Sequence, residues 1–309
     1  MAFESINVNY VGRDAKAYIS RATLGAKSIA GGYVTPQTNV SVPTSISVLE
    51  VGQDLIQAYS SDFVAKGGYT LSQRMLVPKH LMINIELDKQ ILLSSWEADK
   101  MKAGAMNKDI PDDFFAYVTS KIEESANMQV EANLWRGAYN VAGGYTQKFD
   151  GYLTLAAASG STAVKVTGTE GATLSKANIK AALAKAYESA PDEISEKEGF
   201  KLYVSPGTAK AYRMSLGDYE NQSTVGRKPL DFEGIEVVPT AGIVNKNIIV
   251  GTTIDNLIFG TDLVSDLNAF AVKDMFESTL EQKIRVRAEM FACANFAFGE
   301  EFVLYTAGA

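Results

Sequence analysis

The sequence predicts an α+β protein in which extended β segments surround one long helix and one compact mixed unit. Three observations predict this class. Apolar residues alternate with small or charged ones before residue 50 and again near the C-terminus, which is the period of a strand. Between these segments, residues 111–136 carry apolar side chains at steps of three and four, the period of a helix. Short strand and helix patterns alternate over the middle of the chain.

Composition excludes several classes of site. The 309 residues include 29 basic and 36 acidic side chains, a formal net charge of −7, which argues against a surface that grips nucleic acid. The single cysteine, Cys293, excludes an internal disulfide and a Cys-rich zinc site, and the single histidine, His80, excludes a His-pair metal site. We expect Cys293 to be an inert core thiol and His80 to be structural. Because no phosphate-binding, HExxH or GxSxG motif is present, we expect no enzyme and no cofactor or metal.

The first fifty residues are typical of an extended arm. Apolar residues from Val40 to Val48 keep a strand period. Pro36 and Pro43 would restrict any strand here to the edge of a sheet. The start, MAFESINVNY, lacks the basic and apolar regions of a signal peptide. We therefore expect synthesis in the cytoplasm and no membrane partner.

Residues 54–86 are predicted to form a long hairpin-like loop, with strand-like flanks around Lys66-Gly67-Gly68. Because glycine accepts positive φ, the Gly-Gly pair predicts a tight reversal there. A two-stranded excursion is marginal in water without support from elsewhere. Its apolar side chains are therefore expected to pack on a neighbouring surface. The candidate interface residues are Tyr59, Phe63, Lys66, Tyr69 and Leu71.

A long helix is predicted from Pro111 to Arg136. Acidic residues at its start suit the helix dipole, Pro111 fits the first turn and Gly137 is a natural stop. A helix with one apolar stripe is expected to lie as a strut on a sheet or across a neighbour. The stripe consists of Phe115, Val118, Ile122, Ala126, Val130 and Leu134.

The middle of the chain is predicted to be a compact mixed unit. Helices are expected after Ser175 and from Pro206, with a buried strand over 200–204 between them. A strand-turn-strand signal follows over 231–239, and further strands are expected over 248–262.

The C-terminal stretch predicts a half-buried strand. From Ile284 to Ala292, apolar residues alternate with charged ones, so that one face of the strand is charged. Arg285 and Arg287 lie on that face. We expect them to be solvated or to contact a neighbouring subunit.

Several segments, in their order and spacing, resemble one known family. They are IELDKQILLSS (85–95) leading to DDFFAYVTSKIEESANMQVEANLWRG (112–137), FDGYL (149–153), LYVSPGTAKAYRMSLGD (202–218), LDFEGIEVVPTAGI (230–243) and FESTLEQKIRVRAEMFACANFAFGEEFVLY (276–305). The family is the major capsid protein of tailed bacteriophages, which has the Hong Kong 97-type capsid fold. The resemblance extends over most of the chain.

The resemblance implies an extended N-terminal arm, a β-hairpin E-loop, a peripheral domain with a long spine helix, and a mixed α/β axial domain. These map onto 1–32, 33–86, 87–150 with 268–309, and 151–267, with the spine helix at 111–136. The implied function is self-assembly, as hexamers and pentamers, into an icosahedral shell around double-stranded DNA contacted weakly and non-specifically. The implied location is the virion capsid, and the host cytoplasm during assembly.

The resemblance also implies partners. A portal and a decoration protein are expected. Because the sequence starts at Met1 without a charged helical pre-segment, we expect scaffolding by a separate protein. The lysine–asparagine cross-link of some family members is not carried over, because nothing identifies an asparagine partner for Lys66.

Two other interpretations stay open. An encapsulin, which is a nanocompartment shell of the same fold, would enclose an enzyme cargo in place of DNA; the long strand-like arm favours the phage interpretation. An enzyme or a β-rich adhesin is disfavoured by the lack of a catalytic constellation and of a secretion signal.

Overall fold

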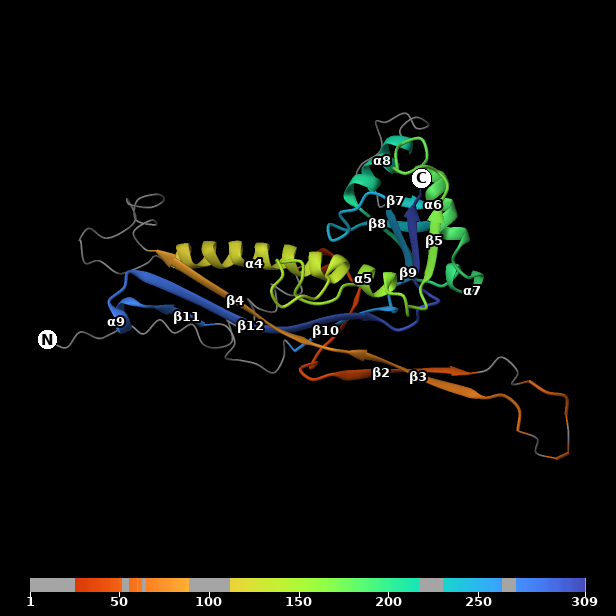
Figure 1. The fold of residues 1–309 in the computed structure, drawn as a ribbon, viewed down its shortest axis with the longest axis horizontal. Coiled ribbons are helices and arrows are strands. Elements are labelled where there is room, and N and C mark those ends of the chain that lie inside the picture. Colours follow the sequence, from red (N-terminus) through yellow and green to blue (C-terminus); the bar gives the residue numbers. More distant parts are fainter. Residues whose placement is uncertain are drawn as a thin grey trace.

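The structure is a computed structural model that describes residues 26–51, 56–59, 61–62, 65–88, 112–216, 230–262 and 271–308. It has three parts (Figure 1): a long sheet lined by one helix, a compact mixed unit at one end of that helix, and a hairpin that extends away from both. The predicted α+β class is confirmed.

The long sheet is organised around one central strand, β12. Strand β4 pairs antiparallel with the N-terminal ten residues of β12, while β10 pairs with its C-terminal part and β11 flanks its start. The edge strand β1 contains Pro36, as the sequence predicts, because a proline at an edge removes no hydrogen bond from the ladder. The strands are β1 (Thr35–Gln37), β4 (Lys79–Asp88), β10 (Leu257–Thr261), β11 (Ala271–Asp274) and β12 (Lys283–Phe296).

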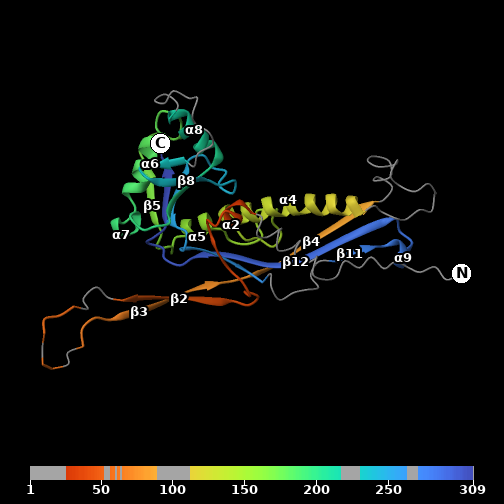
Figure 2. The same cartoon turned by 180° about the vertical axis from the view of Figure 1, so that it is seen from behind.

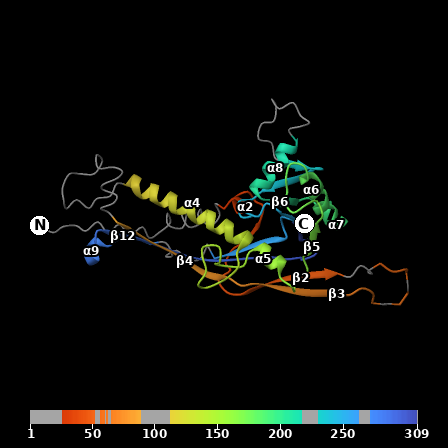
Figure 3. The same ribbon diagram turned by 45° about the horizontal axis from the view of Figure 1, so that its top comes forward.

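Helix α4 (Asp112–Arg136) confirms the predicted long helix and lies along one face of the long sheet (Figures 1 and 3). Its Ile122 packs against the buried face of β12, where apolar residues alternate with exposed arginines as predicted. The side chains of Phe115 and Val118, which belong to the predicted stripe, lie outside the described residues.

The last two turns of α4 correct the expectation of a single apolar stripe. Residues 130–135 are all buried, and they include Glu131 and Asn133. The reason is that this end of the helix is enclosed by the six-stranded sheet and by the segments before and after it. Trp135 contacts the rings of Tyr152 and Tyr203 at 5.5 and 5.0 Å between centroids. Trp135 is therefore an anchor of the core at this end of the helix.

The compact unit is a mixed six-stranded sheet in the order β5-β13-β9-β6-β8-β7. Helices α6 and α8 cover one face, and the other face joins the core formed with α4 and α5. The strands are β5 (Val164–Gly168), β6 (Phe200–Val204), β7 (Leu230–Phe232), β8 (Ile235–Pro239), β9 (Ile248–Thr253) and β13 (Val303–Ala307); the helices are α5 (Tyr152–Ala157), α6 (Ile179–Glu188), α7 (Asp192–Ser195) and α8 (Pro206–Leu216), with α9 (Phe276–Thr279) beside the long sheet.

Local signals explain the elements of this unit. Helix α8 starts at Pro206 as predicted, and the Ser205 hydroxyl caps it by accepting a hydrogen bond from the Thr208 backbone N–H at 3.1 Å. Glu233 and Gly234 have φ of 50° and 84°, so they form the tight turn between β7 and β8. Helix α6 begins later than predicted, because Asn178 accepts from the Ser175 N–H and forms a turn first.

The hairpin consists of β2 (Thr44–Val51) and β3 (Tyr69–Leu76), paired over eight residues. The predicted reversal at Gly67-Gly68 is wrong: the described residues between Val51 and Tyr69 belong to no strand, so the partner of β3 lies farther back in the sequence. The Ser60-Ser61-Asp62 stretch forms strands poorly, whereas β2 is rich in β-branched residues. Residues 79–86, which were expected in the E-loop region, lie in β4.

The described part of the predicted N-terminal arm is also different from the expectation. Residues 27–30 form a helical turn, α2 (Lys27–Ala30), in place of extended chain. The turn is held because Ser28 binds a side chain of α4. No helix in the described part of the chain is long and apolar enough to cross a membrane.

Candidate functional site

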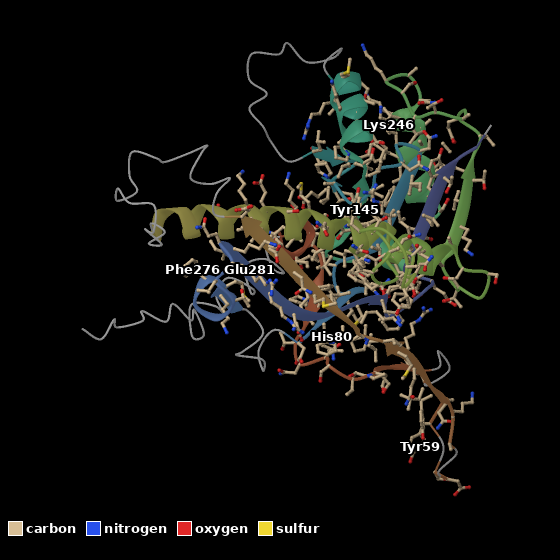
Figure 4. The ribbon with its side chains drawn as sticks, turned by 60° about the vertical axis from the view of Figure 1, so that its left-hand side comes forward. Tyr59, His80, Tyr145, Lys246, Phe276 and Glu281 are labelled. Carbon is tan, nitrogen blue, oxygen red and sulfur yellow. The ribbon has the colours of Figure 1, made fainter. Side chains whose placement is uncertain are left out.

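The hairpin formed by residues 44–76, here called the hairpin arm, extends away from the body of the protein (Figures 1 and 2). Figure 4 places Tyr59 near its far end. The side chain of Tyr59 is 97% exposed, Tyr69 is 77% exposed and Leu71 is 55% exposed. Lys66 is exposed too, and Phe63 lies outside the described residues. The arm therefore presents large apolar side chains that this chain leaves uncovered.

The inner end of the hairpin arm is fastened to the body. Leu76 and Val40 pack in a small buried cluster with Cys293. Arg74 donates to the Thr162 hydroxyl at 2.9 Å and lies 4.5 Å from the centroid of the Phe296 ring. The hairpin arm is therefore anchored to the body at its base.

Cys293 is the inert core thiol that the sequence predicts. It is buried, and its Sγ lies 3.7 Å from the Gly260 carbonyl. Burial raises the pKa of the thiol to about 11, so the reactive thiolate is disfavoured.

The charged face of β12 holds the two predicted arginines. Arg285 donates to Glu86 on β4 at 2.9 Å, and Lys283 donates to the other oxygen of Glu86 at 2.6 Å. Hydrogen bonds from Lys283 and Arg285 lower the pKa of the Glu86 carboxyl. Arg287 pairs with Glu289. Both arginines are exposed, as expected, but each is already bonded to an acid of its own chain.

His80 lies on the same face of the long sheet (Figure 4). Its Nε2 is 3.0 Å from a Glu289 oxygen, and its ring stacks on Phe291 with 4.7 Å between centroids. Arg287 lowers the pKa of the Glu289 carboxyl, with a smaller contribution from His80. This face is an interleaved row of opposite charges, so it offers little net positive charge to a phosphate backbone.

One buried polar cluster was not predicted from the sequence. The Glu131 carboxylate on α4 accepts from the Ser28 N–H at 3.0 Å and from the Ser28 hydroxyl at 2.5 Å. The Trp135 indole N–H donates to the same hydroxyl at 2.9 Å. Glu131 is only 3% exposed, and this burial raises its carboxyl pKa, although the Ser28 hydrogen bonds act in the opposite direction.

This cluster joins residues 103 positions apart, so no local pattern predicts it. The feature of the sequence that could have indicated it is the acidic residue Glu131 inside the mainly apolar run from Val130 to Trp135. We call it the Ser28–Glu131 latch, because it docks the root of the N-terminal segment onto α4.

The described residues contain no group of three or more His, Cys, Asp or Glu side chains that could hold a metal ion. The features that the described residues offer for function are therefore surfaces. They are the apolar hairpin arm, the charged face of β12, and the long helix α4, which packs against both sheets.

Comparisons with known proteins define the fold. No protein-family model matches the chain, and no curated protein matches it. Among solved structures, the chain is similar to one in the satellite phage P4 procapsid that includes the size determination (Sid) protein, with a TM-score of 0.68 and 11% identity over 98% of this chain and 94% of that chain. It is also similar to the capsid of an empty GTA particle, with a TM-score of 0.59 and 16% identity over 100% and 95%.

A third similar structure is the SrpI encapsulin complex of Synechococcus elongatus PCC 7942, with a TM-score of 0.52 and 10% identity over 88% of this chain and 84% of that one. These likenesses show that the chain has the Hong Kong 97-type capsid fold, which confirms the predicted fold.

Proposed function

We propose that this chain is the major capsid protein of a tailed bacteriophage, a structural subunit that is not an enzyme. It self-assembles as hexamers and pentamers into an icosahedral shell that encloses double-stranded DNA. The observation that carries the proposal is the hairpin arm, whose large apolar side chains are uncovered within one chain. Such a surface is stable in water when a partner covers it. In a shell made of identical copies, every arm has a neighbour.

The interface residues of this proposal lie in two places. On the hairpin arm they are Tyr59, Phe63, Lys66, Tyr69 and Leu71. On β12 they are Arg285 and Arg287, whose bonds to Glu86 and Glu289 leave further N–H groups for a neighbouring subunit.

The proposed domain division follows the family pattern. The N-terminal arm is residues 1–32, the E-loop region 33–86, the peripheral domain 87–150 with 268–309, and the axial domain 151–267. The portal, a separate scaffolding protein and a decoration protein are the proposed partners. The DNA is contacted weakly, in keeping with the net charge of −7. The protein would act in the virion capsid, after assembly in the host cytoplasm.

Expression of the full chain, alone and with the gene for its scaffolding protein, tests the proposal. Negative-stain electron microscopy should show closed shells of uniform size. A purified preparation that contains only monomers under both conditions would contradict a shell-forming role.

The second candidate, an encapsulin-type compartment, is favoured by the likeness to the SrpI encapsulin complex. The contents of shells isolated from the native source distinguish the two. Nuclease-protected double-stranded DNA supports the capsid, whereas a single abundant enzyme inside the shell supports the compartment.

A further inference from the structure

Two hollows adjoin over the C-terminal half of α4. The smaller, of about 600 Å³, lies between β4, α4 and the segment 138–149. The larger, of about 1090 Å³, lies between α2, α4 and Ala241. Gln129 and Tyr145 line both hollows. Together they form a surface, here called the α4 groove, that is larger than a typical small-molecule pocket.

The α4 groove has an excess of positive charge, because four cations and two acids line it. Lys79 and Lys148 line the smaller hollow, and Lys27 and Arg136 line the larger. Within the described part of the chain, none of these four cations forms an ion pair. No Asp or Glu lines the smaller hollow.

The two acids of the larger hollow are already bonded. Glu124 accepts from Lys121 at 2.8 Å, and Glu131 belongs to the Ser28–Glu131 latch. In a chain with a net charge of −7, this local positive balance favours an acidic occupant.

Two buried polar atoms at the groove also need a partner. Among the described residues, Arg136 Nε and Asn127 Oδ1 have no hydrogen-bond partner, and both residues line the larger hollow. Buried polar atoms in native proteins are nearly always bonded. Because both atoms are buried, they mark a polar part of the hollow's wall that is incompletely bonded, and they are not themselves exposed to a ligand.

The cations of the smaller hollow are held in place by other contacts. Lys79 Nζ lies 3.9 Å from the centroid of the Tyr139 ring, and Lys148 Nζ donates to the Gly143 carbonyl at 3.0 Å. The Asn133 side chain holds the segment 138–149 in place. It donates to the Tyr145 carbonyl at 2.6 Å and accepts from the Lys148 N–H at 3.0 Å. The walls of the hollow are therefore ordered without an acid, and each lysine keeps N–H donors for a ligand.

Large apolar side chains surround these charges. Contiguous exposed apolar surface next to polar residues is typical of interaction sites. The exposed residues are Met82, Met128, Tyr139, Val141 and Tyr145, and Figure 4 shows Tyr145 beside α4.

We propose that the α4 groove binds a short acidic and apolar peptide segment of a separate protein. Its carboxylates bond to the Arg136 guanidinium and the three lysines, and its apolar side chains cover the exposed methionines and tyrosines. Charge-assisted hydrogen bonds supply the specificity for acid. The proposal goes beyond shell formation and does not depend on it.

A selection from a library of random short peptides, displayed against the purified full chain, tests the proposal. The enriched peptides should pair Asp or Glu with Leu, Ile, Phe or Met. The strongest peptide is then synthesised with a fluorescent label, and its binding is measured by anisotropy. An analogue with Gln and Asn in place of Glu and Asp should bind roughly tenfold more weakly or worse.

Variants of the chain give the second part of the test. The double variant Lys79→Gln, Lys148→Gln and the single variant Arg136→Gln should each weaken binding by roughly tenfold or more. Lys210→Gln, on the exposed side of α8, is the matched control and should bind as the wild type does. Higher salt should weaken binding to the wild type more than to the double variant.

Four outcomes would overturn the proposal. They are a selection without enrichment, enriched peptides that lack acids, equal binding to the double lysine variant, and enriched peptides that reproduce the hairpin arm of this chain. The last would mean that a second copy, and not a separate protein, occupies the groove.

Discussion

At the scale of single residues, the Ser28–Glu131 latch is the contact whose effect on stability follows most directly from its chemistry. A carboxylate that is 3% exposed has lost most of its hydration, and the two hydrogen bonds that it accepts from Ser28 compensate for part of that loss. The latch is the contact that holds the root of the N-terminal segment on α4. Its strength therefore depends on the charge of Glu131.

The direction in which pH changes the stability supplied by this latch can be predicted. Burial raises the pKa of Glu131, so the folded chain binds the proton more tightly than the unfolded chain does. The stability that this proton supplies is fully present below the unfolded pKa of about 4.3 and is lost as pH rises through the folded pKa. Glu131→Gln removes the titratable carboxyl group but keeps the size and shape of the side chain. The free energy of unfolding of the wild type, minus that of Glu131→Gln, should therefore fall as pH rises above about 4.3.

Urea titrations of the unassembled chain at several pH values measure this difference. Glu124→Gln, an exposed residue of the same helix, is the control. A difference between wild type and Glu131→Gln that stays constant or grows with rising pH would disprove the assigned role of burial.

At the scale of elements, α4 joins the two sheets. Its Ile122 packs on the long sheet, and its Leu134 and Trp135 lie in the core shared with the six-stranded sheet. The hairpin arm differs, because it is anchored at its base while Tyr59, Tyr69 and Leu71 are exposed.

The burial of α4 leads to a stability prediction. Leu134 is fully buried, so Leu134→Ala should lower the free energy of unfolding by about 2–5 kcal/mol through lost contacts and a cavity. Lys121→Ala, on the exposed side of the same helix, should change it by less than about 0.5 kcal/mol. Denaturant titration of both variants measures the contrast, and equal effects would mean that the helix face is wrongly assigned.

The hairpin arm leads to a prediction about assembly. Because Tyr69 and Leu71 are exposed in the single chain, the double variant Tyr69→Ser, Leu71→Ser should leave its free energy of unfolding within about 0.5 kcal/mol of the wild type. The same variant should fail to form closed shells. Ser47→Thr, on the partner strand β2, is the control. Sedimentation of the assembly products gives the readout, and a normal yield of particles from the double variant would exclude these residues from the interface.

Sequence reasoning predicted most elements but not all of their partners. The long helix, β12 and the β7–β8 turn were predicted because periodicity and turn residues act over short distances. The hairpin pairing was wrong because the strand that pairs with β3 lies before the uncovered loop, and the Gly-Gly pair suggested a nearer turn. The latch and the α4 groove could not be predicted, since both bring together residues far apart in the sequence.

At the scale of the whole molecule, the chain combines one compact unit with two extended parts (Figures 1 and 2). A compact protein of 309 residues would have a radius of gyration of about 19 Å. The free subunit should clearly exceed this value in small-angle X-ray scattering, because the hairpin arm and the long sheet extend away from the compact unit. A scattering curve that fits a globule of about 19 Å would show that the arm folds back in solution.

The most direct measurement is a cryo-electron microscopy reconstruction of the assembled particles. We predict a closed icosahedral shell in which the hairpin arm of each subunit lies on an adjacent subunit and buries Tyr59, Tyr69 and Leu71 there. Particles that do not close, or a closed shell in which each hairpin arm packs only against its own chain, would contradict the proposal that this chain builds its shell through the arm.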